Sequence, residues 1–301
     1  GRIPACRPPS SEAIRIVRLL VCAGGTGGHI YPALAPVTQL RENGLPPDQI
    51  LWVGAKGKME EQLVPREGLQ LETFFGGAIV GVPIHQTLLN AAKLAWSVPL
   101  AYRAIRRFRP DVMFMTGGYT AVPTTLAARM AGVPVVIFLP DVEPGKAISS
   151  VVRFADKIAC TADGSKAFVP EEKMVVTGYP VRPEVRAAKR LSKAEALAQF
   201  DLTTDRKTLF VFGGSRGAQN INLALMGVLP ELLNTIQVIH ISGTLTWPEV
   251  EANLATLSAE QRAYYRPFSY LHERRGAAFR AADLCLARAG ACMLGESPAF
   301  G

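Results

Sequence analysis

Short apolar runs alternate with stretches of helical spacing along most of the chain. A Leu-rich and β-branched run over residues 14–23 stops at the glycine-rich segment 24–28, and a helix-compatible stretch follows over 33–42. The same order returns with an apolar run over 207–212, glycines within 213–217 and helical spacing over 218–233. Each unit is typical of a strand, a glycine loop and a helix. The pattern therefore predicts two α/β domains of similar plan.

Eight further short apolar runs, bounded by Gly, Pro or charged residues, predict buried strands. They span residues 50–53, 112–115, 133–139, 157–161, 174–177, 238–242, 265–267 and 284–287. Apolar strands separated by helices are typical of parallel sheets that are covered on both faces. We therefore expect two doubly wound, Rossmann-like domains facing a cleft, with the ligand at the carboxyl ends of the strands.

A segment with two prolines and a glycine, residues 178–183, interrupts this pattern and marks the domain boundary. We expect an N-terminal domain over 14–181 and a C-terminal domain over 182–301. Residues 1–13 form a Pro-rich stretch without an initiating Met or an apolar core segment, so they are predicted to be a disordered extension and not a signal peptide.

Composition narrows the function classes. With 301 residues, 49% of them hydrophobic and 19% charged, the chain is too apolar for a disordered protein. Its net charge of +8, spread over both halves, favours anionic partners such as nucleotide phosphates or an acidic membrane surface. The sequence lacks dense Lys/Arg clusters, which argues against a nucleic-acid partner. The five scattered cysteines predict neither a disulfide framework nor a zinc site, and so favour a reducing compartment.

The two glycine loops are candidate phosphate sites. Glycines let backbone amides approach an anion, and the following helix adds roughly half a positive charge. For one such loop, a plain tight turn is an equally good interpretation, but two loops facing one cleft favour phosphate binding. Neither loop matches GxGxxG or GxxxxGK[ST], which disfavours nicotinamide cofactors and P-loop chemistry.

His29 directly follows the first glycine loop. The pKa of an imidazole is about 6.5, and the start of a helix lowers it further. A neutral ring in this position can accept a proton as a general base. From spacing alone, a histidine that only caps its own loop is an equally good interpretation.

Four motifs in order carry a resemblance to a known family. They are residues 24–29 followed by Pro32, residues 116–119 followed by Pro123, residues 213–218, and residues 288–291 leading to Glu296. Their order and spacing, from about residue 16 onward, resemble those of the MurG family, bacterial N-acetylglucosaminyltransferases with the GT-B fold. The resemblance implies inverting transfer of N-acetylglucosamine from UDP-N-acetylglucosamine to the C4 hydroxyl of the muramyl sugar of lipid I, which forms lipid II for peptidoglycan synthesis. It also implies peripheral binding at the cytoplasmic face of the cell membrane.

The resemblance assigns roles to individual residues. His29 is the implied base, and Tyr119 faces the cleft with it. The residues implied to bind substrate are Thr26, Gly27, Gly28, Asp141, Arg182, Gly214, Ser215, Ala291, Cys292, Met293 and Glu296. Those of the first loop lie near the diphosphate and acceptor, those of the second loop near the donor phosphates, and Glu296 near the ribose hydroxyls.

No metal or other cofactor is implied by the resemblance. Inverting transfer needs a base on one face of the anomeric carbon and charge stabilisation for UDP on the other. Backbone amides, a helix N-terminus and an Arg supply the second, and the sequence lacks a DxD-like carboxylate pair at the site. We therefore expect chemistry that does not require a divalent ion.

Two features depart from the family pattern. Asp141 stands where the family has an amide that contacts the donor sugar, and an ionised carboxylate cannot donate a hydrogen bond. The sequence stops at Gly301, where the family continues, so we expect a C-terminally truncated chain with an incomplete second domain. Two alternatives stay open: another GT-B UDP-sugar transferase with a different acceptor, such as a diacylglycerol, or a nucleotide-binding module without turnover.

Residues 84–108 combine apolar positions with a cluster of arginines at their end. Such a segment can lie on an anionic membrane surface. From the residues alone, an amphipathic helix that packs on the sheet is the better interpretation, and Pro99 is predicted to break it. Only the family resemblance favours membrane binding.

Overall fold

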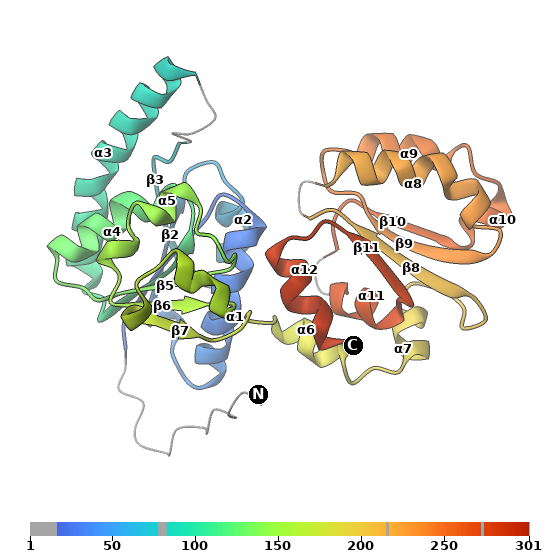
Figure 1. Ribbon diagram of the computed structural model, residues 1–301, viewed down its shortest axis with the longest axis horizontal. Coiled ribbons are helices and arrows are strands. Elements are labelled where there is room, and N and C mark those ends of the chain that lie inside the picture. Colours follow the sequence, from blue (N-terminus) through green and yellow to red (C-terminus); the bar gives the residue numbers. More distant parts are fainter. Residues whose placement is uncertain (1–16, 78–82, 215–216, 272–273, 301) are drawn as a thin grey trace.

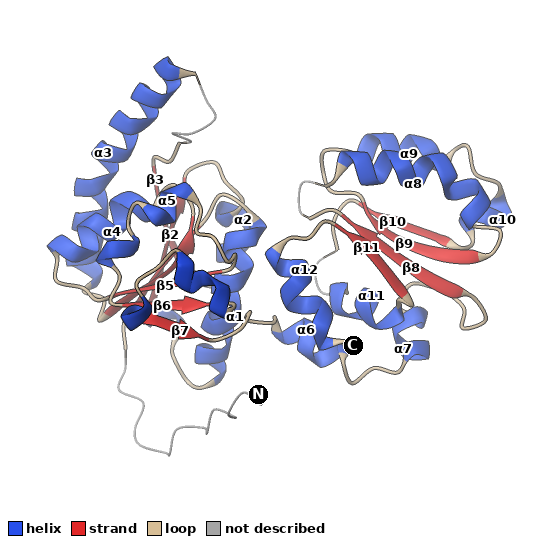
Figure 2. Cartoon of the chain, viewed as in Figure 1, coloured by secondary structure: helices blue, strands red, loops and turns tan. Residues whose placement is uncertain are grey.

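The computed structural model describes residues 17–77, 83–214, 217–271 and 274–300, except for the side chains of Ala291 and Cys292. The strands form two separate parallel sheets, one in each half of the described chain, and helices cover both faces of each sheet (Figures 1 and 2). This architecture confirms the expectation of two doubly wound, Rossmann-like domains.

The first sheet has seven strands and places β1 in its interior. In spatial order the strands are β3 (Gln70–Phe74), β2 (Ile50–Ala55), β1 (Leu19–Ala23), β4 (Val112–Gly117), β5 (Val135–Leu139), β6 (Lys157–Cys160) and β7 (Met174–Val176). Its helices are α1 (Gly27–Glu42), α2 (Glu60–Arg66), α3 (Ile84–Phe108), α4 (Ala121–Met130) and α5 (Lys146–Ser149).

Alternation along β1 explains why this sheet is covered on both faces. Leu20 and Cys22 pack in one core with side chains of α3 and α4, whereas Leu19 and Val21 pack in a second core with α1 and α2. Successive side chains of a strand point to opposite faces, so a strand that is apolar throughout requires two covering layers.

The second sheet has four strands, in the order β10 (Tyr265–Phe268), β9 (Ile236–Ile241), β8 (Lys207–Phe212) and β11 (Leu284–Ala287). Its helices are α6 (Pro183–Ala188), α7 (Lys193–Ala198), α8 (Gln219–Leu232), α9 (Trp247–Leu254), α10 (Ala259–Arg262), α11 (Arg275–Ala281) and α12 (Ala291–Glu296). One core lies between the sheet and α8 and α9, and the other lies between the sheet and α7 and α11.

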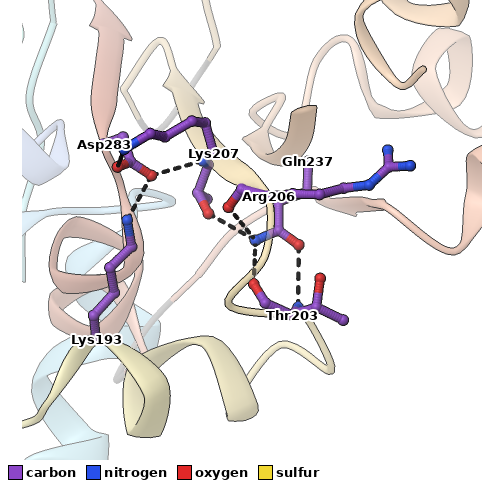
Figure 3. A network of polar contacts seen from close by, with 7 residues as sticks. Lys193, Thr203, Arg206, Lys207, Gln237 and Asp283 are labelled. Carbon is purple, nitrogen blue, oxygen red and sulfur yellow. Dashed lines mark hydrogen bonds and ion pairs between the residues drawn. The ribbon is translucent and has the colours of Figure 1, made fainter. Parts of the chain in front are cut away.

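A polar network joins the amino-terminal ends of β8 and β11 (Figure 3). Asp283, just before β11, accepts hydrogen bonds from Lys193 Nζ at 2.6 Å, Lys207 Nζ at 3.1 Å and the Thr208 amide at 2.9 Å. Burial by itself raises the pKa of Asp283, but these donors outweigh it and hold the pKa at about 2. The network ties the amino-terminal end of β11 to that of its neighbour β8.

Both glycine loops lie where the strand order of their sheet reverses. In the first sheet this switch point is between β1 and β4, and in the second it is between β8 and β11. The loop over 24–26 follows β1, and the loop over 213–218 follows β8. Switch points at the carboxyl ends of parallel strands are the usual ligand sites of such sheets.

Three local expectations were wrong. β3 was not predicted, because Gln70, Glu72 and Thr73 make this edge strand polar. Helix α1 begins at Gly27 and not near residue 33, so two glycines form its first turn. Helix α3 continues through Pro99 without a break, since the helix is assigned over all of Ile84–Phe108.

Candidate active site

The first glycine loop turns directly from β1 into α1. Gly25 has a φ of +86°, a conformation that strongly favours glycine. Thr26 is the N-cap of α1, and its side chain does not cap the helix. The backbone amides of Gly27 and Gly28 therefore open the helix in positions that have no intrahelical acceptor. Such amides, at the positive end of a 16-residue helix, suit an anion.

His29 sits in the first turn of α1 against the end of β4. Its Nδ1 lies 3.1 Å from the Thr116 carbonyl oxygen, and the Thr116 hydroxyl donates to the His29 carbonyl at 2.6 Å. A side chain at Gly117 would collide with the imidazole, so glycine at this position makes room for the ring. Because a carbonyl only accepts, Nδ1 carries the hydrogen in the neutral ring, and Nε2 is left as the basic atom.

The surroundings of His29 act on its pKa in opposite directions. Burial of the partly buried ring lowers the pKa of His29 below its ordinary value, and this effect is the largest. The Thr116 hydrogen bond and the negative charges of Asp141 and Glu60 raise it in part. The net lowering keeps the imidazole neutral near pH 7. Asp141 thus acts on the same side chain that sequence analysis assigned as the base.

The second glycine loop packs closely against buried polar groups. Gly217 has a φ of +89°, and a Cβ there would overlap the Ser242 carbonyl oxygen. Asn222, in α8, donates to that carbonyl at 2.7 Å and accepts from His240 Nε2 at 2.9 Å. Burial lowers the pKa of His240 to about 4, so this ring is a neutral structural group. Gly214 is exposed with a φ of +90°, whereas Ser215 lies outside the described residues.

Arg182 and Glu296 form a buried ion pair at the boundary between the domains. Arg182 Nε donates to Glu296 Oε1 at 2.9 Å, and Arg275 Nε donates to Oε2 at 3.0 Å. Glu296 is 2% exposed and Arg182 is 6% exposed. Burial alone lowers the pKa of Arg182, but the charges of Glu296 and Glu184 outweigh it and raise the pKa. The family resemblance implies a donor contact for both residues, and their pairing with each other was not predicted.

The first helix of the N-terminal domain touches the second domain. The Tyr270 hydroxyl donates to the Tyr31 hydroxyl, and the Arg182 guanidinium lies 4.6 Å from the centre of the Tyr31 ring. Arg186 also donates to the side-chain oxygen of Gln39 at 3.1 Å. These contacts join α1, the helix that carries His29 in its first turn, to the second domain. Figure 1 shows α1 and α12 on the facing sides of the two domains.

The remaining candidate site residues have fewer described contacts. Tyr119, after β4, is 40% exposed, as a side chain facing a cleft would be. Met293, at the start of α12, packs against the core of the second domain. Ala291 and Cys292 belong to α12, but their side chains lie outside the description. Across the ranges described, no three His, Cys, Asp or Glu side chains gather as metal ligands.

Glu60, Tyr31 and Asn222 belong to the site but were not found from the sequence. Glu60 accepts a hydrogen bond from the Gly25 amide, Tyr31 contacts the other domain, and Asn222 supports the second loop. In the sequence, Glu60 looks like any acid at a helix start, and Asn222 like any polar residue of an amphipathic helix. Only the fold brings them to the loops.

The chain matches two family models and many known proteins. The glycosyltransferase family 28 N-terminal domain matches residues 19–160, and the glycosyltransferase family 28 C-terminal domain matches residues 208–301. A UDP-N-acetylglucosamine--N-acetylmuramyl-(pentapeptide) pyrophosphoryl-undecaprenol N-acetylglucosamine transferase from Roseiflexus sp. is 35% identical, over 98% of this chain and 78% of the relative. A transferase of the same name from Desulfitobacterium hafniense is 36% identical, over 93% of this chain and 76% of its own.

Solved structures support the same fold. The crystal structure of Acinetobacter baumannii MurG matches with a TM-score of 0.64 at 23% identity, over 92% of this chain and 74% of that one. A UDP-GlcNAc 2-epimerase from Neisseria meningitidis, bound to UDP-GlcNAc, matches with a TM-score of 0.60 at 13% identity, over 92% and 79% of the two chains. At these identities the structures show the GT-B-like arrangement of two domains and no more.

Proposed function

The chain belongs to glycosyltransferase family 28, among the transferases that move N-acetylglucosamine onto undecaprenyl-linked muramyl pentapeptide, and from this we propose how its cleft performs the reaction. UDP-N-acetylglucosamine is the donor and lipid I is the acceptor, so the product is lipid II. The observation that carries the proposal is the placement of both glycine loops at the switch points of two facing sheets, with His29 directly after the first.

His29 is the proposed general base. Its Nδ1–H is held by the Thr116 carbonyl, so Nε2 is the atom that removes the proton from the C4 hydroxyl of the muramyl sugar. The C4 oxygen forms its bond to the anomeric carbon of N-acetylglucosamine as the bond from that carbon to the UDP oxygen breaks. UDP leaves with the electron pair, and the configuration at the anomeric carbon is inverted. The amides that open α1 bind the diphosphate of the acceptor.

The second loop is the proposed cradle of the leaving UDP. Negative charge develops on its phosphates as the glycosidic bond breaks, so preorganised donors there lower the barrier. The amides of the loop precede α8, a 14-residue helix whose positive end faces the loop. Gly217 of this loop packs against the Ser242 carbonyl, which accepts a hydrogen bond from Asn222. Arg182 and Glu296 pair at the domain boundary, and their contact with the donor is part of the proposal.

The test is transfer of labelled N-acetylglucosamine from its UDP form to a short-chain lipid I analogue, with diacylglycerol as a second acceptor. We expect product with the lipid I analogue, and the same rate after a divalent-metal chelator is added. Product only with diacylglycerol would favour the other transferase, and UDP binding without any product would favour a nucleotide-binding module. Loss of activity in the chelator, restored by magnesium or manganese, would contradict the proposed metal-independent chemistry.

The pH dependence follows from the lowered pKa of His29. A base must be unprotonated, so kcat/KM falls as the pH drops through the pKa of His29. Because burial lowers that pKa, the midpoint of the acidic limb is expected below about 6.5. In Asp141→Asn a charge that raises the pKa is gone, and the midpoint moves to still lower pH. A pH–rate series for both proteins measures the two midpoints, and a midpoint above 6.5, or a shift upward in the variant, would contradict this assignment.

Peripheral binding at the cytoplasmic face of the membrane is proposed through α3. At about 100° per residue, Ile84, Leu88, Leu89 and Trp96 fall on one face of this helix, and each is more than half exposed. The opposite face, buried in the second half of the helix, packs on the domain and on α4. Figure 1 shows the first turns of α3 extending past the body of the domain.

Exposed basic residues follow this apolar face along α3 toward its carboxyl end. Lys93 and the arginines at positions 103, 106, 107 and 109 are all exposed. Apolar side chains that enter the headgroup region, together with nearby cations, bind an anionic leaflet. A lipid-linked acceptor requires that the enzyme reach this surface. None of the helices in the described ranges is both long and apolar enough to cross a bilayer.

Introduction of negative charge on this face is expected to weaken vesicle binding. In the double variant Leu88→Glu/Leu89→Glu, two side chains that enter the lipid become charged, so binding to vesicles of anionic phospholipid should fall by about tenfold or more. Co-sedimentation measures the bound fraction. Met130→Glu is a matched control, since Met130 is 67% exposed at the end of α4. Equal binding by the double variant and the wild type would contradict the proposed role of α3.

A further inference from the structure

A buried carboxylate lies beneath the first glycine loop. Glu60 is the first residue of α2, directly after the turn that follows β2, and it is fully buried. An acid that merely begins a surface helix stays in water, because burial of a charged group is costly unless hydrogen bonds satisfy it. The position of Glu60 inside the domain therefore requires partners.

Those partners are backbone amides of two different segments. Glu60 Oε1 accepts from the Ala55 amide at 2.7 Å, at the end of β2. The Gly25 amide donates to Oε1 at 3.2 Å and to Oε2 at 3.0 Å. Hydrogen bonds from amides to a carboxylate are short and strong. One side chain thus joins the end of β2 to the loop that precedes α1.

Two glycines make the space for this carboxylate. A Cβ at Gly24 would overlap Glu60 Oε1, and a Cβ at Gly54 would overlap Glu60 Cγ. Neither glycine is in the left-handed region that favours glycine, so backbone conformation does not explain them. The glycines at positions 24 and 54 are needed because Glu60 occupies the volume that their side chains would take.

The contact with Gly25 bears on the geometry of the site. Gly25 has a φ of +86°, and free glycines sample many conformations. Once the carboxylate holds its amide, the chain leaves Gly25 in one direction, and Thr26 then begins α1 with His29 in its first turn. The Gly25 amide faces Glu60 and is unavailable to a substrate phosphate. The amides that remain available to the phosphate are those of the residues after Gly25, at the start of α1.

We propose that Glu60 is a positioning residue for the transfer reaction, which holds the first glycine loop and the start of α1 in the conformation that receives the lipid diphosphate and aims His29 at the acceptor hydroxyl. The proposal rests on the proposed function of the cleft. Glu60 touches neither substrate, because its oxygens are turned to Gly25 and Ala55.

The near-isosteric change Glu60→Gln tests this role. An amide nitrogen then takes the place of Oε2 and faces the Gly25 N–H, so the shorter of the two Gly25 contacts is replaced by a donor–donor clash while the volume is kept. We expect kcat/KM for the lipid I analogue to fall on the order of 10- to 100-fold with a raised acceptor KM. The KM for UDP-N-acetylglucosamine stays at the wild-type value, since its loop is on the other domain. Glu61→Gln, at the exposed neighbouring residue, should behave as the wild type.

The pH profile gives a readout that a purely structural role would not move. The charged groups acting on His29 are Asp141 and Glu60, and both raise its pKa. The Thr116 carbonyl contact does the same. Removal of the Glu60 charge should therefore shift the acidic limb of kcat/KM to lower pH. A variant that is only partly folded would lose amplitude at every pH without a shift of the midpoint.

A double-mutant cycle with Gly54 tests the contact from the other side. Gly54→Ala should displace the carboxylate and raise the acceptor KM in the same way as Glu60→Gln. In Glu60→Ala the space is vacated, so the addition of Gly54→Ala should cost little further, and the two effects are not additive. Gly227→Ala is the control glycine, because nothing lies within 4 Å of its Cβ position.

Hydrogen exchange of the Gly25 amide provides a measurement that does not depend on activity. We expect protection of this amide in the wild type and faster exchange in Glu60→Gln, with the exchange of β1 unchanged. Wild-type exchange and a wild-type acceptor KM in Glu60→Gln would overturn the positioning role. If Glu60→Gln does not fold, a wild-type acceptor KM in Gly54→Ala overturns it. A wild type that protects Gly25 but transfers no sugar would instead count against the proposed function.

Discussion

Replacement of His29 by alanine is expected to lower kcat of the transfer reaction by about 10²- to 10⁴-fold, the range that general-base catalysis contributes. The expectation rests on the Nδ1 contact with Thr116, which leaves Nε2 as the basic atom, and on the burial that lowers the pKa of the ring. Without the imidazole, the C4 hydroxyl must lose its proton to water as it attacks. The binding of UDP should be unchanged, because the second loop is on the other domain.

Two measurements separate a catalytic loss from a folding defect. Calorimetry with UDP reports whether the second domain is intact, and the transfer assay reports the chemical step. The variant Tyr31→Phe is a useful comparison, since it alters the contact with Tyr270 two residues from His29 without removing a base. Turnover by His29→Ala within about threefold of the wild type would rule out His29 as the base.

Replacement of Glu296 by alanine is expected to produce the largest loss of stability. It leaves the guanidinium groups of Arg182 and Arg275 without the carboxylate that pairs with both, inside a region where the three side chains are nearly buried. Breaking a buried pair by removing one partner typically costs about 3–5 kcal/mol, because the other charge stays desolvated. Urea-induced unfolding should therefore show a transition at markedly lower urea concentration.

Glu184 provides the matched control for this prediction. It also pairs with Arg182, at 3.4 Å, but its side chain is 36% exposed. Glu184→Ala should cost less than about 1 kcal/mol, as expected of an exposed pair. If both alanine variants unfold at the same urea concentration, the Arg182–Glu296–Arg275 cluster contributes no more than a surface contact.

Sequence patterns predicted the interior of the fold better than its edges. The run that became β8, an interior strand of the second sheet, was found at its observed bounds, because a strand buried on both faces is largely apolar. β3 was not predicted because an edge strand tolerates polar residues, which hide its apolar pattern. The start of α1 was misplaced because Gly27 and Gly28 have low helix propensity, and their helical conformation depends on contacts that the sequence does not display.

Only the part of the candidate site that is contiguous in sequence was predicted. The loops and His29 are contiguous in sequence, so motif spacing found them. Glu60 and Glu296 act through contacts between residues 35 and 114 positions apart, which only the fold creates. The pairing of Arg182 with Glu296 had no signal in the sequence, and the prediction that each contacts the donor remains a prediction.

The configuration of the new glycosidic bond tests the account most directly. One displacement at the anomeric carbon, with His29 as base on one domain and UDP leaving toward the other, converts the α-linked donor into a β-linked product. The disaccharide is formed from UDP-N-acetylglucosamine and a short-chain lipid I analogue. Nuclear magnetic resonance then measures the coupling constant of its anomeric proton, which distinguishes an α from a β linkage. We expect the β-1,4 linkage alone. An α-linked product, or release of free N-acetylglucosamine without transfer, would contradict the account.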